Sequence, residues 1–415
     1  MSTTDLAAAR NARLVRWLTC LMFFTFAMTT DAVGSVIPQI IAEFRLSMTA
    51  AGSFQYATMA GIAGGALLLG FLADRIGRKR TIILGLSLYG ASSLLFAVTH
   101  EFAVFVVLLA LAGLGISVFK TGALALIGDI AASTASHTRF MNTVEGFFAV
   151  GAIVGPAIVA TLVASGISWK WLYVVAALIC MVLMIIAARV RYPQAKEITQ
   201  RATLAQMVGV MQDPLALGFS ALIMLYVAVE VAIYVWMPTY LEEYSGSFGW
   251  LPGYALTIFF VLRALGRFLG AWLLGRLSWT VALVLCSLAI LLCFVGSLLG
   301  GVETGAWLLP LSGLCMSIMY PTLNSKGISC FPRSQHGAAA GVILFFTAAA
   351  AALGPLAMAA VSDAYGGTRA GFVLATAFAL LLFAGLVGNW LLNPAGRRLQ
   401  SSDRTNYSAA AGPAA

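Results

Sequence analysis

Seven ionisable side chains lie inside long apolar runs of this sequence, where each could bind a proton, pair with an opposite charge or hold a polar solute. A charged side chain at the centre of a bilayer-spanning helix costs roughly 2.5–3.5 kcal/mol on insertion scales. Residues kept at that cost usually have a function. The seven are Asp31, Lys120, Glu145, Glu230, Arg263, Arg267 and Lys326.

Opposite charges occur at matching depths of neighbouring runs. Lys120 and Glu145 lie near the joined ends of two consecutive runs, and Asn142 lies three residues before Glu145, on the same helical face. Glu230 and Arg263 both lie near the middle of another two runs. We interpret the opposite charges of each set as a pair, Lys120 with Glu145 and Glu230 with Arg263. Asn142 is expected beside the first pair. The position of Arg267 near the end of its run favours a structural role. Lys326 could reach the membrane–water interface by snorkelling.

A second group of polar residues repeats at helical spacing. Tyr226, Glu230 and Tyr234 recur every four residues and therefore share one helix face. Aromatic rings beside a carboxylate suit a sugar, because rings stack on its C–H face while the acid accepts its hydroxyl groups. Tyr320 and Asn324 form another such face. The alternative is that these tyrosines pack against neighbouring helices.

The elements that carry these residues are expected to be membrane-spanning helices. Of the 415 residues, 61% are hydrophobic and 9% are charged, whereas a globular domain carries about 25% charged residues. A spanning helix needs about 20 apolar residues. Twelve such runs occur, at 17–38, 51–73, 81–99, 102–127, 141–165, 171–189, 215–239, 250–275, 281–300, 306–330, 337–362 and 370–392. The sequence predicts an all-α membrane protein.

The runs form two sets of six that resemble each other. We expect bundles over 17–189 and 215–392, an N-terminal segment 1–16, a central loop 190–214 and a disordered tail 393–415. Motifs recur at an offset of about 200 residues: Pro38 and Glu43 as Pro238 and Glu243, Gly113-Leu114 as Gly313-Leu314, and Gly155-Pro156 as Gly354-Pro355. Parallel repeats of this kind imply a pseudo-two-fold axis along the membrane normal, with a binding site between the halves.

The distribution of basic residues sets the expected orientation. If the N-terminus is cytoplasmic, only Arg45, Lys170 and Arg369 of the 24 Lys and Arg fall on the outer side. Such an asymmetry follows the positive-inside rule and places both termini in the cytoplasm. The net charge of +9 comes from the ends of apolar runs, not from one face, which argues against nucleic-acid binding. The expected location is a bacterial inner membrane.

The loop after the second run carries a family motif. It reads Gly70-Phe-Leu-Ala-Asp74-Arg75-Ile-Gly77-Arg78-Lys-Arg and resembles the signature loop of the major facilitator superfamily. The resemblance implies the major facilitator fold of twelve helices. It also implies a gate formed by Gly70, Asp74, Arg75, Gly77 and Arg78, in which Asp74 caps a helix of the other half and holds the cytoplasmic side closed. The second half retains only Gly270 and Arg276 of this motif.

Within the superfamily, the sequence is most similar to the fucose/galactose/glucose–proton symporters. The stretches at 226–230, 142–156 and 319–322 carry this resemblance. It implies that an acid of the first span, here Asp31, takes the coupled proton. Asp31 has no evident cation at its depth, which fits that role, and Glu230 is the next candidate. The alternative is that Asp31 bonds the interrupted backbone near Pro38.

The resulting functional expectation is secondary active transport by alternating access. A proton-coupled symporter of a small polar solute would bind its substrate through Lys120, Glu145, Asn142, Tyr226, Glu230, Tyr234, Arg263, Tyr320 and Asn324. Where the fucose permease type carries an acid in the fourth span this sequence has Lys120, which favours a sugar acid or organic anion over a neutral sugar. The glycines at 151 and 155 also resemble an efflux motif, so a proton-coupled antiporter for drugs or metabolites stays open. The least favoured alternative is a membrane sensor that does not transport a solute.

The sequence lacks the residue patterns that ATP-driven pumps, metal sites and enzymes require. No phosphate-binding G-x-x-x-x-G-K-[ST] loop occurs, so we expect no ATP-binding subunit. The three His form no metal cluster, the six Cys lie inside apolar runs as packing residues, and no nucleophile–base arrangement stands out. We expect no enzyme activity, no cofactor and no metal. The expected partners are the solute, the proton and the lipid bilayer, with the protein acting as a monomer.

Overall fold

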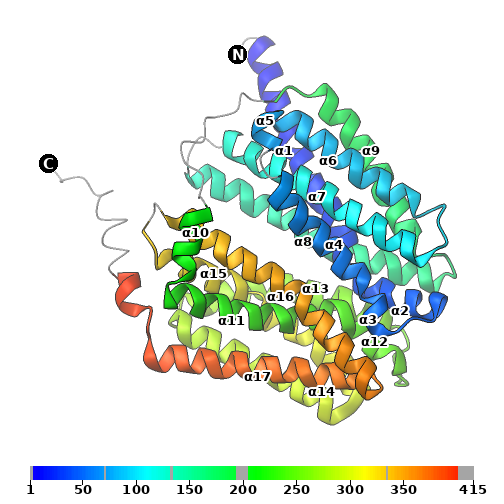
Figure 1. The fold of residues 1–415 in the computed structure, drawn as a ribbon, viewed down its shortest axis with the longest axis vertical. Coiled ribbons are helices and arrows are strands. Elements are labelled where there is room, and N and C mark those ends of the chain that lie inside the picture. Colours follow the sequence, from blue (N-terminus) through cyan, green and yellow to red (C-terminus); the bar gives the residue numbers. More distant parts are fainter. Residues whose placement is uncertain (1–2, 70–71, 131–133, 193–203, 333–334, 401–415) are drawn as a thin grey trace. The chain divides into compact units, whose positions relative to one another are not determined.

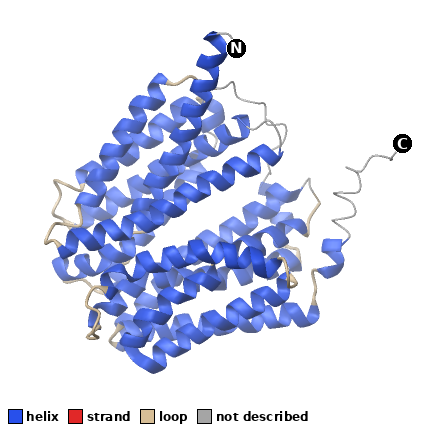
Figure 2. Ribbon diagram, turned by 180° about the vertical axis from the view of Figure 1, so that it is seen from behind, coloured by secondary structure: helices blue, strands red, loops and turns tan. Residues whose placement is uncertain are grey.

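The structure is a computed structural model that describes residues 3–69, 72–130, 134–192, 204–332 and 335–400. Within these ranges every regular element is helical, which confirms the all-α expectation (Figures 1 and 2). The first nine helices are α1 (Thr3–Thr30), α2 (Val33–Phe44), α3 (Met48–Ala51), α4 (Ser53–Leu69), α5 (Leu72–Arg75), α6 (Arg78–Leu95), α7 (Phe102–Ile130), α8 (Thr134–Ala164) and α9 (Trp171–Arg189).

The remaining elements include two short departures from α-helical geometry. A π-helix covers Ala232–Trp236 and a 3₁₀ turn covers Leu241–Glu243. The α-helices are α10 (Leu204–Met211), α11 (Pro214–Val231), α12 (Met237–Tyr240), α13 (Leu251–Leu274), α14 (Trp279–Met316), α15 (Met319–Ser329), α16 (His336–Tyr365) and α17 (Thr368–Leu392).

Nine segments of the described chain are long and apolar enough to cross a membrane. The other predicted runs are also helical. Each is left out of the nine segments, or joined to another run, for an identifiable reason. The α14 helix contains two runs, because it continues through a kink at Gly301, where φ is +73°. The α6 helix begins with three basic residues, and α4 ends at Leu69, next to residues outside the described ranges. Helices satisfy every backbone hydrogen bond internally, which the bilayer interior requires.

The chain divides into two compact units, Met1–Glu197 and Ile198–Ala415. In the first unit α1 packs on α8, α4 on α7, and α6 on both α7 and α9. In the second unit α11 packs on α16, α13 on α14, and α14 on α17. Since α11, α13 and α16 hold the seventh, eighth and eleventh predicted runs, the second unit repeats the packing of the first.

Glycines make close helix contacts at equivalent places of the two units. A Cβ added at Gly155 of α8 would lie 2.0 Å from the main-chain oxygen of Met28 on α1. A Cβ added at Gly354 of α16 would lie 3.1 Å from the Cα of Ala228 on α11, the counterpart of Met28 in the repeat. Small residues allow such close approach of membrane helices. The Gly-Pro repeat therefore has a packing role in each unit.

Polar ties join the first and last helices of each unit. In the first unit the side-chain amide of Asn11 donates to the carbonyl of Arg191 at 2.6 Å and accepts from its N–H at 3.0 Å. In the second unit Arg398 Nη1 bonds Asp213 Oδ2 at 2.6 Å, and Asp213 also caps α11 through the N–H of Leu215. Arg398, beyond the end of α17, therefore contacts the residue that caps the start of α11.

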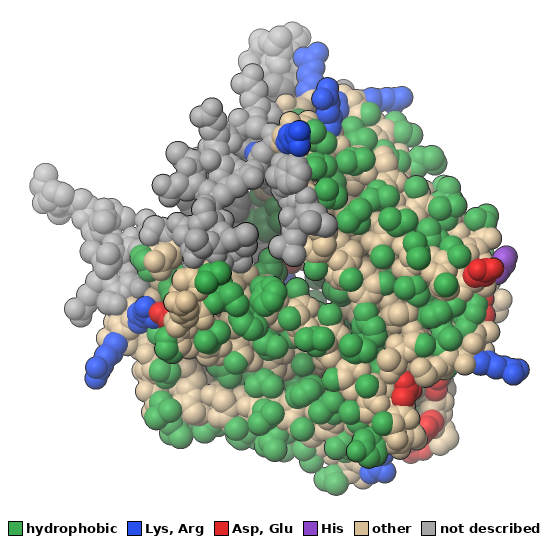
Figure 3. Space-filling view, viewed as in Figure 1, with side chains coloured by type: hydrophobic (Ala, Val, Ile, Leu, Met, Phe, Trp, Pro, Cys, Tyr) green, Lys and Arg blue, Asp and Glu red, His purple; other side chains and the backbone are tan. Residues whose placement is uncertain are grey.

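The surface is consistent with contact to lipid. Large apolar side chains are exposed along several helices, including Leu299, Leu392 and Phe268. The face drawn in Figure 3 is covered mainly by hydrophobic side chains, with the charged ones at its margins. A soluble monomer does not expose apolar area on this scale. Each of the six Cys is a free thiol, buried or half-buried among the helices, as expected of packing residues.

Candidate functional site

A buried carboxylate lies on α11 of the second unit. Glu230, with 9% of its side chain exposed, accepts two donors on the same oxygen, Oε1. Arg263 Nη2 of α13 approaches to 2.5 Å and the hydroxyl of Tyr226, one turn earlier on α11, to 2.7 Å. The predicted pairing of Glu230 with Arg263 is confirmed. Arg263 is 26% exposed, so the pair is dry on the carboxylate side and more open on the guanidinium side.

Departures from regular helix surround this pair. Glu230 lies two residues before the π-helix, which is followed by Pro238 in α12. The Tyr226 hydroxyl also bonds the carbonyl of Met316 at 2.9 Å, where α14 ends and two turn residues precede α15. Short π-helical segments frequently occur at functional sites. The carboxylate thus lies near the end of α11, and Tyr226 links it to the turn between α14 and α15.

The first unit contains a second charged group, centred on Lys120 of α7. Its ammonium lies 5.1 Å from the centroid of Phe26 and 5.9 Å from that of Phe23, both on α1. The carboxylates of Glu145 and Asp31 both act electrostatically on Lys120. Lys120 and Glu145 are therefore neighbours as predicted, although the described residues show no hydrogen bond or ion pair between them.

The premise that Asp31 has no cation at its depth is wrong. Asp31 lies at the break between α1, which ends at Thr30, and α2, which begins at Val33. It accepts a hydrogen bond from the Thr30 hydroxyl at 3.1 Å and lies within electrostatic reach of Lys120. Estimating depth by counting along a straight helix missed this neighbour, because the helix is interrupted at Asp31 itself.

The predicted role of Tyr226 needs revision. Its side chain is fully buried and its hydroxyl group is already bonded to Glu230 and Met316, so the ring offers no face to a solute in this structure. Tyr226 instead positions the carboxylate. The ring of Tyr234 is half-buried and lies 6.5 Å from that of Phe260, at an interplanar angle of 31°.

The remaining predicted residues lie on helices in the two units. Tyr320 and Asn324 are half-buried, one turn apart on α15. Lys326 is half-buried on α15 and Arg267 is exposed on α13. Asn142 lies on α8, and its side chain is outside the described set. Their roles stay predictions.

The signature loop is described in part. Gly70 and the side chain of Asp74 lie outside the described residues, so the proposed cap is left as a prediction. Arg75 ends α5 and is exposed, while Arg78 begins α6 and is buried. Gly77 between them has φ +86°, a conformation that side chains disfavour. This explains why the turn has Gly at that position.

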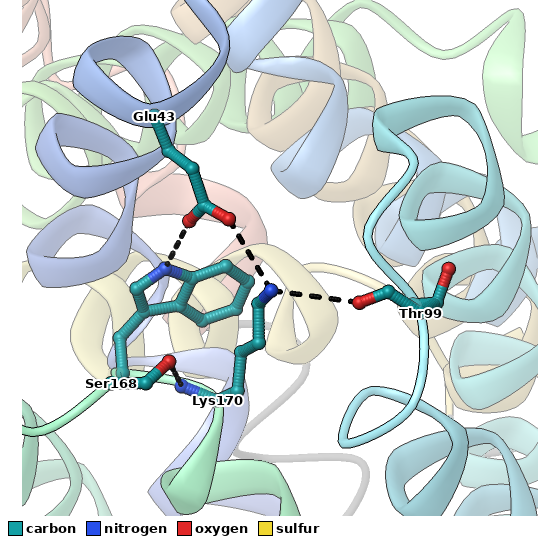
Figure 4. Close-up of polar contacts among 5 residues, drawn as sticks. Glu43, Thr99, Ser168 and Lys170 are labelled. Carbon is teal, nitrogen blue, oxygen red and sulfur yellow. Dashed lines mark hydrogen bonds and ion pairs between the residues drawn. The ribbon is translucent and has the colours of Figure 1, made fainter.

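A polar cluster that the sequence did not predict closes one end of the first unit (Figure 4). Glu43 at the end of α2 accepts from Lys170 Nζ at 3.3 Å and from the Trp169 indole at 3.2 Å. Lys170 also donates to the Thr99 carbonyl at 3.5 Å. In the second unit Arg369 donates to the Leu298 carbonyl at 3.1 Å, at the equivalent place of the repeat. Lys170 and Arg369 occupy equivalent positions of the repeat, and so do Thr99 and Leu298, whose carbonyls they bind. This correspondence is the sequence signal that could have identified the contact.

The described part of the chain contains no group of three or more His, Cys, Asp or Glu residues arranged to hold a metal ion. Tyr192, which lies outside the spans, is a perturbed titratable group. Burial raises the pKa of the Tyr192 phenol above its usual range, and its ring lies 6.0 Å from Lys79 Nζ. Lys79 itself donates to the carbonyls of Ala188 and Val190 at the end of α9. Lys79 of the signature loop therefore has a helix-capping role.

Comparison with known proteins agrees with this architecture. The family model of the Major Facilitator Superfamily matches residues 19–343. The chain is 24% identical over 362 residues to the L-fucose-proton symporter of Escherichia coli, covering 78% of this chain and 82% of the relative. It is 25% identical to a glucose/galactose transporter of Brucella abortus, covering 93% and 97%. It is 27% identical to the 3-(3-hydroxy-phenyl)propionate transporter of E. coli, covering 72% and 73%.

Solved structures share the fold. A bacterial homologue of the human lysosomal transporter Spinster, in an inward-facing conformation, superimposes with a TM-score of 0.76 at 14% identity, covering 94% of this chain and 98% of the other. The transporter FucP in its outward conformation gives a TM-score of 0.64 at 21% identity, covering 91% and 98%. At these identities the likeness concerns the fold alone.

Proposed function

This chain belongs to the Major Facilitator Superfamily, and from that premise we propose that it is a proton-coupled symporter of a small polar solute, acting by alternating access. Membership of this family makes it a membrane transporter and not an enzyme. The coupling ion, the direction and the solute are the proposed parts. The substrate classes in view are sugars, sugar acids and other organic anions.

The observation that carries the proposal is the placement of an acid at a helix interruption in each unit. Asp31 lies at the break between α1 and α2, and Glu230 lies two residues before the π-helix. Interrupted helices are where transporters of this kind bind ions and substrates. An ionisable group at such a place can change its charge as the helix flexes. We assign the coupled proton to Asp31, with Glu230 as the second candidate.

Export by antiport receives less support. Its sequence basis was the pair Gly151 and Gly155, which resembles an efflux motif. A Cβ at Gly151 would lie 2.2 Å from the Phe24 carbonyl oxygen and one at Gly155 would lie 2.0 Å from that of Met28. Close packing of α8 on α1 therefore accounts for both glycines without reference to direction.

The relatives favour a small polar solute. Their names state proton symport of L-fucose, transport of glucose or galactose, and transport of an aromatic propionate. The Glu230–Arg263 pair offers both a hydrogen-bond acceptor and a set of donors, which a polyol or a carboxylate could use. The positive-inside pattern supports an inner-membrane location with both termini in the cytoplasm.

The test is uptake into proteoliposomes that contain the purified protein. A panel of hexoses, sugar acids, aromatic and aliphatic carboxylates and hydrophobic cations is supplied with and without an inward proton gradient. Gradient-driven accumulation of a sugar or carboxylate above its external concentration supports the proposal. Gradient-driven expulsion of hydrophobic cations, with no sugar or carboxylate accumulated, would contradict it in favour of the antiporter.

A further inference from the structure

Tyr226 has one hydroxyl hydrogen and two acceptors within hydrogen-bonding distance. Its oxygen lies 2.7 Å from Glu230 Oε1 and 2.9 Å from the main-chain oxygen of Met316. A phenol has a single O–H donor, so one of the two acceptors receives that hydrogen at the expense of the other. The side chain is fully buried, which holds the hydroxyl between both acceptors. The position of this one hydrogen therefore depends on which acceptor needs it more.

The need of Glu230 for this hydrogen depends on Arg263. Glu230 Oε1 also accepts from Arg263 Nη2 at 2.5 Å, so the carboxylate charge is compensated while the pair is intact. If the guanidinium is withdrawn, Tyr226 is the remaining donor to that oxygen among the described residues. A buried charge without donors costs more than a buried carbonyl without one. Loss of the guanidinium therefore draws the hydrogen towards Glu230 and away from Met316.

The carbonyl at stake belongs to the end of a helix. Met316 is the last residue of α14, and two turn residues separate it from α15, which begins at Met319. The last carbonyls of a helix have no partner within the helix, and Tyr226 supplies a donor to this one. The α15 helix carries Tyr320 and Asn324, two of the predicted solute-binding residues. Tyr226 thus fastens the turn that positions them.

The helix that carries Arg263 packs on the same turn. A Cβ added at Gly266 of α13 would overlap the main-chain oxygen of Leu314, and one added at Gly270 would overlap the side chain of Ile318. Gly266 lies three residues after Arg263. The two helices that form the charge pair, α11 and α13, therefore both contact the turn between α14 and α15.

The hydroxyl of Tyr226 responds to the charge pair more than to other groups nearby. Besides Glu230 and Arg263, Tyr234 acts electrostatically on it. Cys315, beside Met316, interacts with Cys286. Charged and titratable side chains described on the helices packed against α11 are not among the groups that act on Tyr226, namely Tyr320, Lys326, Asp363, Tyr365 and Arg369.

We propose that Tyr226 transmits the state of the Glu230–Arg263 pair to the turn between α14 and α15. When a solute takes the Arg263 guanidinium, which is 26% exposed, the Tyr226 hydrogen moves to Glu230 and the Met316 carbonyl loses its donor. The turn is then released, and α15 changes its angle to α14. Return of the guanidinium to Glu230 restores the bond, and no covalent bond changes. Tyr226 is a positioning residue in this scheme, which rests on the proposed function because it requires a solute at Arg263.

The experiment is isotope-edited infrared spectroscopy of the purified protein in detergent, with methionine labelled at its carbonyl carbon. Subtracting the spectrum of the same protein with Met316→Leu isolates the Met316 band, which moves to lower frequency when its carbonyl accepts a hydrogen bond. Glu230→Gln should lower this frequency relative to the parent, because a neutral amide competes less well for the Tyr226 hydrogen. Arg263→Met should raise it at alkaline pH, which keeps Glu230 ionised.

Removal of the hydroxyl tests whether Tyr226 carries the effect. In Tyr226→Phe the band should lie at the higher frequency, and adding Glu230→Gln or Arg263→Met should no longer move it. The matched control is Tyr240→Phe, since Tyr240 is also buried and its hydroxyl bonds another α14 carbonyl, that of Ser297, at 3.4 Å. This control should keep both shifts. If Tyr226→Phe fails to elute as one symmetrical peak in size-exclusion chromatography, the opposite shifts of the other two variants carry the test.

Two results would overturn the inference. One is a Met316 band that does not move in opposite directions in Glu230→Gln and Arg263→Met. The other is survival of both shifts in the Tyr226→Phe background. The spectra need no solute, so they are independent of the uptake assay. Gradient-driven accumulation in proteoliposomes would leave the proposed symport standing after either result, and its absence for every solute would remove the proposed function whatever the spectra show.

Discussion

Removing Arg263 should strand a buried carboxylate. In Arg263→Met the flexible apolar chain fills most of the space, but Glu230 Oε1 loses the guanidinium that lies 2.5 Å away. The Tyr226 hydroxyl at 2.7 Å is then its one remaining donor within the described residues. Breaking a buried ion pair by removing one partner costs about 3–5 kcal/mol. We expect a loss of that size in the free energy of unfolding.

The double variant measures the interaction itself. Glu230→Gln with Arg263→Met leaves no charge at the site, and replacing a whole buried pair by neutral groups is often close to neutral. The double variant should therefore be more stable than Arg263→Met, with a coupling energy of about 2 kcal/mol or more. The assay is denaturant unfolding in detergent micelles, followed by tryptophan fluorescence.

The matched control lies one turn further along α13. Arg267 is exposed, so Arg267→Met should change the free energy of unfolding by about 0.5 kcal/mol or less. A double variant whose loss equals the sum of the two single losses would refute the idea that Glu230 and Arg263 stabilise each other.

The other predictions concern packing, capping and topology. Gly155→Ala should abolish the yield of folded protein in an expression assay, because its Cβ would lie 2.0 Å from a main-chain oxygen of α1. The control Gly146→Ala has open space around it and should fold like the parent in the same assay. Lys79→Met should lower the free energy of unfolding by about 0.5–1.5 kcal/mol through loss of its carbonyl bonds, while the exposed Arg80→Met should not; equal effects would rule out the capping role. In a variant without native cysteines, Ser247→Cys should react with an impermeant maleimide added to intact cells and Arg80→Cys should not. The reverse pattern would refute the proposed orientation.

The fold was predictable from the sequence because it depends on patterns that do not require side-chain geometry. Apolar runs of spanning length predict the helices, and short motifs that recur about 200 residues apart predict their internal repeat. The pairing of Glu230 with Arg263 was also predictable, since both lie near the middle of adjacent runs joined by a short loop.

The contacts that were missed depend on how helices bend and on chain segments far apart in the sequence. Depth along an unbroken helix predicts an isolated Asp31, but the break between α1 and α2 brings it within electrostatic reach of Lys120. The spacing of Tyr226 along α11 predicts which helix face it occupies, but spacing alone does not distinguish a cavity from a neighbouring helix. Glu43 lies at the end of α2 and Lys170 lies directly before α9. No pattern of neighbouring residues in the sequence predicts that they form an ion pair.

The central claim, that solute and proton move together in the same direction, is tested most directly by a pH-sensitive dye trapped inside proteoliposomes. Solute is added outside with no gradient imposed, and the signal of protein-free liposomes is subtracted to remove passive diffusion of weak acids. Symport predicts acidification of the interior upon solute entry. Asp31→Asn should lose this acidification while still exchanging labelled solute between equal pools. Alkalinisation of the interior, as an antiporter would give, or solute entry without any protein-dependent pH change, would contradict the account.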